Sequence, residues 1–198
     1  MTVTIRMAKL ADAAQLLAIY QPYVEETAIS FEYQVPSLDI FKERLSKTLA
    51  FYPFLVVEED NQILGYAYAS PFHVREAYAW SAEVSIYLGM AARGKGLGRA
   101  LYQALEDLLR EMGILNLNAC IASSEQENSY ISKASPAFHE KSGYQLVGKF
   151  HKSGYKFGQW FDMIWMEKII GQHDSPVKTV TSIHEVLKHL ETYSKKIS

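Results

Sequence analysis

Cysteine is almost absent from this sequence. Cys120 is the only cysteine among 198 residues, so the chain forms no internal disulfide, and no Cys or His lies beside it at the spacing of metal ligands. It stands in an apolar run, where a cysteine is usually buried and inert. We therefore expect no metal site, and we expect a protein of a reducing compartment such as the cytoplasm.

Long apolar runs and an excess of one charge are also absent. No stretch approaches the roughly 18 consecutive apolar residues that span a bilayer, and residues 1–9 lack the apolar core of a signal peptide. The formal net charge is −2, so the overall field gives no reason to expect nucleic acid or an anionic membrane as a partner. We expect a soluble, cytoplasmic protein that binds neither.

The sequence does contain enough apolar material for one large domain. Hydrophobic residues make up 48% of the chain, and 13 Tyr, 9 Phe and 3 Trp can fill a core. Apolar spacing predicts the order β-α-α-β-β-β-α-β-α-β-β, which is a mixed α/β domain and not the regular alternation of a doubly wound nucleotide fold. The strands are expected at 3–7, 54–58, 63–69, 81–88, 115–121, 144–150 and 161–169, and the helices at about 12–24, 37–49, 96–112 and 135–142.

The last part of the chain differs in character. Residues 171–176 resemble a linker, and the capping-box pair Ser182 and Glu185 then predicts an amphipathic helix. The basic end of this helix, Lys195 and Lys196, suits the helix dipole. Its apolar stripe must pack on its own domain or on a partner chain, and comprises Ile183, Val186, Leu187, Leu190 and Tyr193. The predicted division is residues 1–170 for the domain and 171–198 for the linker and helix.

The most informative segment joins the predicted strand 81–88 to the predicted helix 96–112. Three glycines within five residues let the backbone curl closely around a ligand. The free amides and positive dipole end of the helix's first turn favour an anion, as do three cationic side chains. We therefore predict a pyrophosphate site and not an ordinary glycine-rich turn, with a spacing that fits neither a P-loop nor a dinucleotide fingerprint. The segment is Arg93-Gly94-Lys95-Gly96-Leu97-Gly98-Arg99.

The pattern Arg93-x-x-Gly96-x-Gly98 matches the coenzyme A pyrophosphate signature of the GNAT family of N-acetyltransferases. Other segments extend the match, and the chain resembles the phosphinothricin acetyltransferases from about residue 3 to 169. The matching segments are Tyr52-Pro53-Phe54-Leu55-Val56, Gly65-Tyr66-Ala67-Tyr68-Ala69-Ser70-Pro71, Arg75-Glu76-Ala77-Tyr78-Ala79-Trp80, Ala82-Glu83, Tyr87, His139-Glu140-x-x-Gly143-Tyr144 and Gly158-x-Trp160-x-Asp162. The C-terminal helix lies outside this resemblance.

The resemblance implies a fold, a co-substrate and the residues that hold it. The GNAT fold is a mixed α/β fold with flanking helices and a central, mostly antiparallel sheet of six to seven strands, two of which splay apart. Here a C-terminal helix would be added. The co-substrate is acetyl-CoA, and no metal takes part. By resemblance, the cofactor-binding residues are Ile86, Tyr87 and Leu88 through their backbone and, in the loop, Arg93, Gly94, Lys95, Gly96, Leu97, Gly98 and Arg99.

Two residues are implied in catalysis. Glu83 matches the general base that deprotonates the amine, directly or through water, a role worth about 10²–10⁴ in rate. A solvated carboxylate on a half-buried strand is the alternative. His139 stands where many GNAT enzymes have a tyrosine that protonates the leaving thiolate. An imidazole with a pKa near neutrality suits an acid or a base, and a packing or capping role stays open.

Three residues match positions near the acceptor amine of phosphinothricin acetyltransferases: Phe31, Arg75 and Tyr78. An arginine forks onto a carboxylate or phosphinate, although a surface salt bridge is the alternative for Arg75. The stretch 123–135 is longer than in those enzymes, and Asn128 is out of register with the family's cofactor-binding Asn. These departures leave the identity of the acceptor open.

The resemblance implies an acetyl-CoA-dependent N-acetyltransferase for a small amino acid or an amino-acid-like toxin such as phosphinothricin or methionine sulfoximine. Direct transfer in a ternary complex is favoured, because Cys120 has no His beside it. Trp160 and Tyr155 lie in a region that reaches a partner subunit in the resembling enzymes, which implies a homodimer, with core packing as the alternative. The alternative functions are acetylation of another small amine or of a peptide amine, and a non-catalytic acetyl-CoA-binding module. A module of that kind could lack Glu83 and His139, and both residues are present here.

Overall fold

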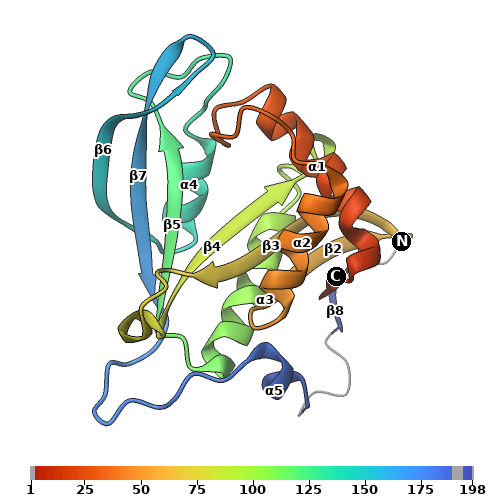
Figure 1. Cartoon of the computed structure of the whole chain (residues 1–198), viewed down its shortest axis with the longest axis vertical. Helices are drawn as coiled ribbons and strands as arrows, with labels where there is room; N and C mark the ends of the chain where they lie inside the picture. The colour runs from red at the N-terminus through yellow and green to blue at the C-terminus, as the bar shows by residue number, and fades with distance from the viewer. Residues whose placement is uncertain (1–2, 189–193, 198) are drawn as a thin grey trace.

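A computed structural model describes residues 3–188 and 194–197 of the chain, and shows a single sheet flanked by helices (Figure 1). The order of elements predicted from apolar spacing is confirmed. The strands are β1 (Val3–Met7), β2 (Phe54–Glu59), β3 (Gln62–Pro71), β4 (Ser81–Leu88), β5 (Asn116–Ser123), β6 (Gln145–Lys156), β7 (Gln159–Ile169) and β8 (Ser194–Ile197). The helices are α1 (Ala13–Glu25), α2 (Leu38–Leu49), α3 (Leu97–Met112), α4 (Ala134–Lys141) and α5 (Ile183–Lys188), and three short 3₁₀ turns are η1 (Leu10–Asp12), η2 (Glu76–Tyr78) and η3 (Met90–Ala92).

The sheet has the strand order β6-β7-β5-β4-β3-β2-β1-β8. Each neighbouring pair is antiparallel except β4 with β5. The mixed α/β class and the mostly antiparallel sheet are therefore as expected, while β8 brings the sheet to eight strands. The β6–β7 hairpin is longer than the sequence pattern suggested, because the chain reverses in a tight turn at Phe157 and Gly158, both with positive φ.

Strands β4 and β5 lie side by side only at one end. Their parallel pairing covers Ser81–Glu83 against Asn116–Asn118, whereas β4 continues to Leu88 and β5 to Ser123. Beyond Glu83 the two strands diverge, as Figure 1 shows. The expected splay is thus present, and it opens a gap in the middle of the sheet.

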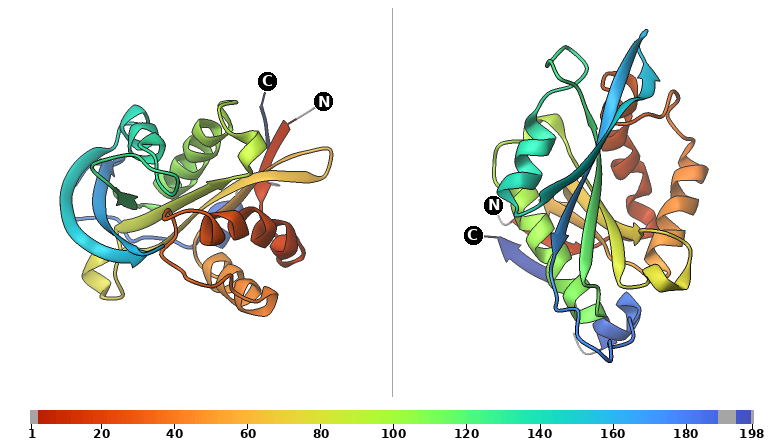
Figure 2. Two further views of the ribbon diagram at one scale, coloured as in Figure 1. Left: turned by 90° about the horizontal axis from the view of Figure 1, so that it is seen from above. Right: turned by 90° about the vertical axis from the view of Figure 1, so that its left-hand side faces the viewer.

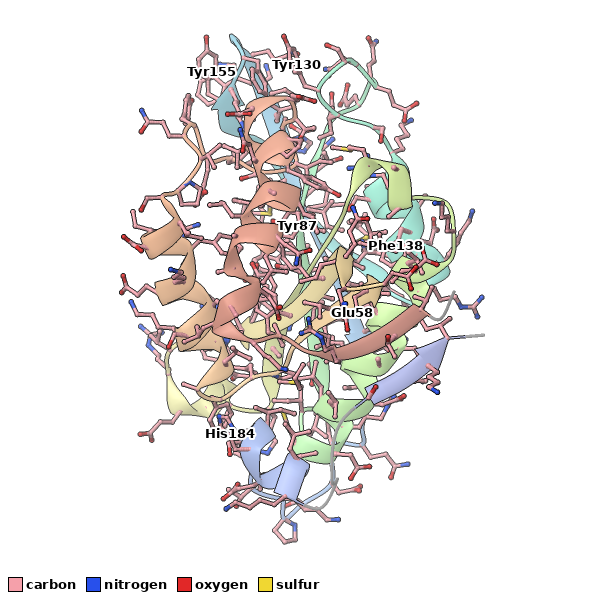
Figure 3. The ribbon with its side chains drawn as sticks, turned by 90° about the vertical axis from the view of Figure 1, so that its right-hand side faces the viewer. Glu58, Tyr87, Tyr130, Phe138, Tyr155 and His184 are labelled. Atoms are coloured by element: carbon pink, nitrogen blue, oxygen red, sulfur yellow. The ribbon has the colours of Figure 1, made fainter. Side chains whose placement is uncertain are left out.

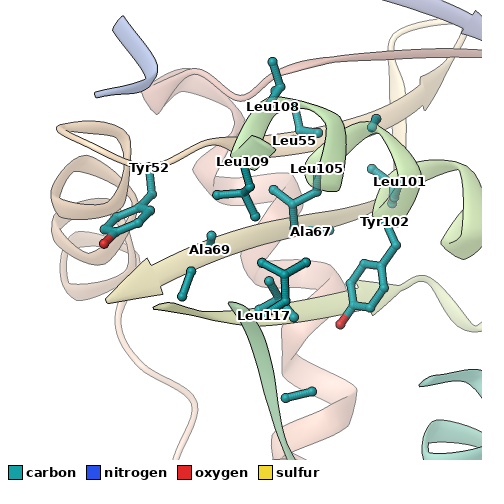
Figure 4. Close-up of a cluster of buried hydrophobic side chains, with 14 of the residues drawn as sticks. Tyr52, Leu55, Ala67, Ala69, Leu101, Tyr102, Leu105, Leu108, Leu109 and Leu117 are labelled. Carbon is teal, nitrogen blue, oxygen red and sulfur yellow. The ribbon is translucent and has the colours of Figure 1, made fainter. Parts of the chain in front are cut away.

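Helices cover both faces of the sheet (Figure 2). Helices α1 and α2 lie on one face and α3 and α4 on the other. The stripe predicted for α3 is buried against the sheet and forms the centre of the larger core (Figure 4). It consists of Leu97, Leu101, Ala104, Leu105 and Leu108. This packing fixes the first turn of α3 beside the end of β4.

The tail packs on the same domain. In α5, Ile183 is 0% exposed and joins the core beneath α3, and its amide donates to the carbonyl of Phe51 at 2.9 Å. Strand β8 pairs with β1. The prediction of a helix reaching Lys195 and Lys196 is wrong, because both residues lie in β8. The open edge of β1 offers backbone partners that a solvent-exposed helix end lacks. The predicted stripe residues Leu190 and Tyr193 lie outside the described residues.

Candidate functional site

The glycine loop has an open, concave backbone. Gly94 and Gly96 have φ values of +75° and +78°, which strain residues with a Cβ, and a Cβ built at either position meets no atom within 4 Å. Gly96 is the N-cap of α3 and so directs the chain into the helix. This open space and the exposed side chains of Arg93, Lys95 and Arg99 fit a polyphosphate lying on the loop.

The first turn of α3 presents free amides at the same place. Its first intrahelical bond runs from the Ala100 amide to the Gly96 carbonyl, so the amides of Leu97, Gly98 and Arg99 have no intrahelical acceptor. Gly98 is needed for close packing, since a Cβ there would lie 3.3 Å from the Phe138 ring and 3.4 Å from Leu88. The loop residues expected to bind pyrophosphate are therefore brought together around one anion-binding helix end.

A cavity with about 500 Å³ of empty space, which includes its opening to solvent, lies between the diverging strands. Its walls come from both strands, from α3 and α4, and from the loops before α2 and α4. The lining residues are Ile29, Val84, Ser85, Ile86, Tyr87, Tyr102, Ala119, Cys120, Ile121, Ala122, Ile131, Ser132, Ser135 and His139.

The backbone of β4 that faces this cavity is partly engaged. The Tyr23 hydroxyl donates to the Leu88 carbonyl at 2.6 Å and accepts from the Leu88 amide at 3.0 Å. Because the backbone groups of an antiparallel strand alternate in direction, Ile86 points the same way as Leu88 and Tyr87 points toward β3. Of the three residues expected to bind the cofactor through their backbone, only Ile86 has an amide and a carbonyl that point to the gap and are not hydrogen-bonded to Tyr23. The sequence pattern did not identify Tyr23.

Glu83 occupies the last paired position before β4 and β5 part, opposite Asn118. Its side chain is half-buried. Burial raises the pKa of the Glu83 carboxyl above its ordinary value, and the nearby His73 ring partly offsets this effect. A partly desolvated carboxylate at the edge of a cavity is the arrangement expected of a general base. A fully solvated carboxylate, the alternative interpretation, does not fit this burial.

His139 is buried and engaged on both ring nitrogens. It is 3% exposed, with Nδ1 2.8 Å from the Ser135 carbonyl and Nε2 2.9 Å from the Tyr102 hydroxyl. Burial lowers the pKa of His139, although the bond to Ser135 opposes this. In the neutral ring, the carbonyl requires a proton on Nδ1, so Nε2 accepts from Tyr102. His139 in this form has no proton directed at the cavity.

The loop between β3 and β4 carries two of the expected acceptor residues, Arg75 and Tyr78, and its His73 acts on the Glu83 carboxyl. Tyr78 forms edge-to-face contacts with Phe72 and His73, at centroid distances of 5.9 and 4.9 Å, and Phe72 contacts Trp165 of β7 at 5.5 Å. Arg75 is exposed, and no described residue pairs with it in an ion pair. Arg75 therefore forms no surface salt bridge with a described residue, which was the alternative interpretation.

Phe31 lies against the β6–β7 hairpin. It contacts Phe161 of β7 at a centroid distance of 6.5 Å and lies against Gly154 of β6. Within the described part of the chain, no hydrogen bond or ring contact joins Phe31 to Arg75 or Tyr78. The three predicted acceptor residues thus fall into two groups, Arg75 and Tyr78 in the loop between β3 and β4 and Phe31 against the β6–β7 hairpin, and none of them is among the residues that line the cavity.

Two other sequence-based expectations are decided here. Cys120 is exposed and lines the cavity, so the prediction that it is buried is wrong, because β5 has parted from β4 at that level. Burial of its thiol and the charge of Glu83 nevertheless raise the pKa of Cys120 to about 11. Asn128 accepts hydrogen bonds from the amides of Tyr130 and Ile131, and so stabilises its own loop.

Among residues 3–188 and 194–197, no three His, Cys, Asp or Glu side chains converge as metal ligands would, and no helix is long and apolar enough to cross a membrane.

Sequence reasoning missed three side chains at the site: Tyr23, His73 and Tyr102. Tyr23 is hydrogen-bonded to Leu88, and Tyr102 is hydrogen-bonded to His139. His73 lowers the pKa of the Glu83 carboxyl. Tyr102 stands on the predicted apolar stripe side of α3, where an aromatic residue is ordinarily assigned to the core. Only the packing of α3 against α4 shows that its hydroxyl reaches His139.

Residues 5–165 match a family model described as an acetyltransferase (GNAT) domain. Among characterised relatives, the phosphinothricin N-acetyltransferase of Alcaligenes faecalis is 32% identical over 173 residues, which is 87% of this chain and 85% of that protein. The L-methionine sulfoximine/L-methionine sulfone acetyltransferase of Salmonella typhimurium is 32% identical over 177 residues, 87% of this chain and 98% of the relative.

A solved structure has the same architecture. The GNAT superfamily phosphinothricin acetyltransferase of Sinorhizobium meliloti, in complex with AcCoA, superimposes with a TM-score of 0.80 at 32% identity. The match covers 92% of this chain and 99% of that one. The similarity therefore extends over both the glycine loop and the diverging strands.

Proposed function

The chain belongs to the GNAT family of acetyl-CoA-dependent N-acetyltransferases, and from this premise we propose that its acceptor is a small amino acid or an amino-acid-like toxin of the phosphinothricin or methionine sulfoximine type. The observation that carries the proposal is Glu83, half-buried where β4 and β5 part. The acceptor class is supported by the names of relatives about one-third identical in sequence.

The residues of this chain fit acetyl-CoA. The free amides at the start of α3 and the cations Arg93, Lys95 and Arg99 would hold its pyrophosphate. The bound co-substrate supplies the acetyl thioester. The Ile86 amide, open to the gap, would stabilise charge that develops on a carbonyl oxygen. For Leu88 to serve in the same way, the Tyr23 hydroxyl must leave it.

Glu83 is the group proposed to accept the proton of the amine. Its raised pKa, caused by burial, makes the carboxylate a better base than a solvated glutamate. His73 is positioned to modulate that carboxylate through its charge. Arg75, which has no acidic partner among the described residues, is available for the carboxylate or phosphinate of the acceptor, and Phe31 and Tyr78 for its aliphatic part.

Direct transfer in a ternary complex is the mechanism that we propose. At neutral pH a thiol with a pKa of about 11, as at Cys120, is almost entirely protonated, which disfavours an acetyl-cysteine intermediate. His139 is proposed to position groups at the cavity, since its neutral ring already accepts from Tyr102.

We also propose that the protein is a cytoplasmic homodimer. Large apolar side chains are exposed on the β6–β7 hairpin, including Trp160 at 58% and Phe150 at 55%. Exposure of this extent excludes core packing as the role of Trp160, and clustered exposed aromatics are typical of an interface. Size-exclusion chromatography with light scattering tests the dimer, which a monomer across the micromolar range would contradict.

The enzymatic proposal is tested by thiol release from acetyl-CoA. The acceptors are phosphinothricin, methionine sulfoximine, methionine sulfone, common amino acids, polyamines and a short peptide. We expect fast release with an amino-acid analogue and a loss of about 10² or more in rate in Glu83→Gln, because the base is removed while the shape is kept. Glu76→Gln, in the loop between β3 and β4 and without an ion pair to any described residue, is the matched control.

Each result has a defined meaning. Turnover of a peptide or polyamine in preference to amino-acid analogues would overturn the acceptor class. Unchanged turnover in Glu83→Gln would overturn the assignment of the base. Binding of acetyl-CoA without turnover of any acceptor would favour the non-catalytic binding module.

A further inference from the structure

The segment after α1, residues 27–33, forms one wall of the cavity. Ile29 lines the opening between β4 and β5, and Phe31, two residues later, is the expected acceptor contact. The segment has no helix or strand of its own. Its position therefore depends on its contacts with neighbouring helices, strands and loops.

Lys156, at the end of β6, is hydrogen-bonded to this segment and to the last turn of α1. It is 3% exposed, and its Nζ donates to the carbonyls of Val24 at 2.7 Å, Thr27 at 2.9 Å and Ser30 at 2.6 Å. All three protons of the ammonium group are thus used. Val24 and Thr27 lie at the C-terminal end of α1, where the helix dipole favours a cation. The Ser30 carbonyl stands between Ile29 and Phe31.

Further contacts hold the segment against the same hairpin and against the loop before α4, which contains Tyr130. The Tyr33 hydroxyl donates to the Tyr155 carbonyl, and the Ala28 amide donates to the Tyr130 carbonyl at 2.9 Å. Figure 3 shows Tyr130 and Tyr155 together at this end of the molecule. A Cβ built on Gly154 would lie 2.4 Å from the Phe31 ring, so the ring rests directly on the backbone of β6.

The opposite side of the segment is tied to α1. The Ser30 and Tyr20 hydroxyls are 2.7 Å apart and hydrogen-bonded, and the Tyr20 ring meets Tyr87 edge-on at 5.0 Å. The carbonyl of Ser30 is bound by Lys156 and its side chain by Tyr20. Residue 30 is therefore fixed from two directions, and it stands between Ile29, which lines the cavity, and Phe31, which rests on β6.

We infer that Lys156 is a positioning residue for the acceptor: its ammonium group fastens residues 27–33 to the β6–β7 hairpin and so sets where Ile29 and Phe31 stand at the site. This inference rests on the proposed function for its catalytic consequence. A buried lysine without a carboxylate partner is costly unless its hydrogen bonds are complete. The three carbonyls supply those bonds only while the segment keeps this conformation.

The test compares Lys156→Met with Lys152→Met. Methionine keeps an apolar stem and removes all three donors. Lys152 lies on the same hairpin, is exposed, and has no side-chain contact with a described residue, so the control loses the same charge. We expect Lys156→Met to raise the KM of the acceptor about tenfold or more, equivalent to about 1.4 kcal/mol, while the KM of acetyl-CoA changes less than about twofold.

A second measurement does not depend on activity. Hydrogen–deuterium exchange of the peptide spanning residues 27–33 should be faster in Lys156→Met than in wild type, and unchanged in Lys152→Met. An unchanged acceptor KM together with unchanged exchange would overturn the inference. An equal rise in the KM of both substrates would show general support of the fold in place of acceptor positioning.

Gly154→Ala covers the case in which Lys156→Met does not fold. The added methyl group pushes on Phe31 without changing charge, so the acceptor KM should rise and that of acetyl-CoA should not. If it leaves the acceptor KM unchanged, the inference fails. Absence of turnover in wild type would refute the proposed function separately, and the exchange of residues 27–33 would still decide the role of Lys156.

Discussion

At the scale of single residues, the site separates two candidate proton-transfer groups by their surroundings. Glu83 is half-buried with a raised pKa, whereas His139 is buried with a lowered pKa and both nitrogens bonded. A carboxyl whose pKa is raised takes up its proton at a higher pH than usual. It is therefore a base only above that pH.

The pH dependence of kcat/KM distinguishes the two groups. We expect activity to fall as the pH decreases through the raised pKa of Glu83, at a midpoint above 4.5, the ordinary value for this carboxyl. The acid limb should vanish in Glu83→Gln and persist in His139→Gln, whose rate loss should stay well below the 10²–10⁴ typical of a lost base, at about tenfold. An acid limb that disappears in His139→Gln would assign the proton transfer to His139.

At the scale of elements, the junction between β4 and α3 depends on backbone conformation. Gly96 caps α3 with φ +78°, a region that costs other residues roughly 1–2 kcal/mol. The side chains of Arg93, Lys95 and Arg99 are exposed and the glycines have none, so the shape of this junction is set by the backbone and by the packing of Leu97 and the rest of α3. This explains why the pattern of glycines was informative in the sequence.

Gly96→Ala is expected to weaken the binding of coenzyme A, and to lower stability by about 1 kcal/mol. The strain is conformational, because a Cβ at this position meets no atom within 4 Å. Gly148→Ala on β6 is the control, since its Cβ is equally unobstructed and its φ is not positive. Isothermal titration with coenzyme A and thermal unfolding measure both effects. Equal affinities in the two variants would refute the role of the loop conformation.

At the scale of the whole molecule, the tail is part of the folded domain. Helix α5 inserts Ile183 beneath α3, and β8 extends the sheet along β1. The loop before α5 is also fastened, because the Thr181 amide donates to the Met112 carbonyl at 2.9 Å. The tail should therefore unfold together with the rest of the chain.

Ile183→Ala is expected to lower the free energy of unfolding by about 2–5 kcal/mol, the cost of a cavity at a fully buried site. His184→Ala, at the exposed neighbouring position, should change it by less than about 0.5 kcal/mol. Chemical denaturation monitored by circular dichroism measures both variants. A small effect at Ile183 would indicate that the tail packs independently of the core.

How much of this protein could be predicted depends on whether the information is local. Strands and helices followed from apolar spacing, and the loop Arg93–Arg99 followed from glycines whose conformation is needed wherever the loop stands. The strand conformation of Lys195 and Lys196 could not be predicted in this way. A capping box and an apolar stripe describe a helix on their own, but the open edge of β1 is formed by residues almost two hundred positions away.

The sequence by itself determined the order of elements and the predicted anion-binding helix start, because each rests on residues close together in the chain, while the resemblance to phosphinothricin acetyltransferases pointed to Glu83 as a candidate base. Only the tertiary structure decided that His139 accepts a hydrogen bond from Tyr102 and that Tyr23 is hydrogen-bonded to the backbone of Leu88. It also decided that Lys156 donates to three carbonyls in and just after the last turn of α1. Such contacts join residues 37, 65 and 126 positions apart. A hydrogen bond depends on where two groups meet in space, and that is set by the packing of whole helices and strands.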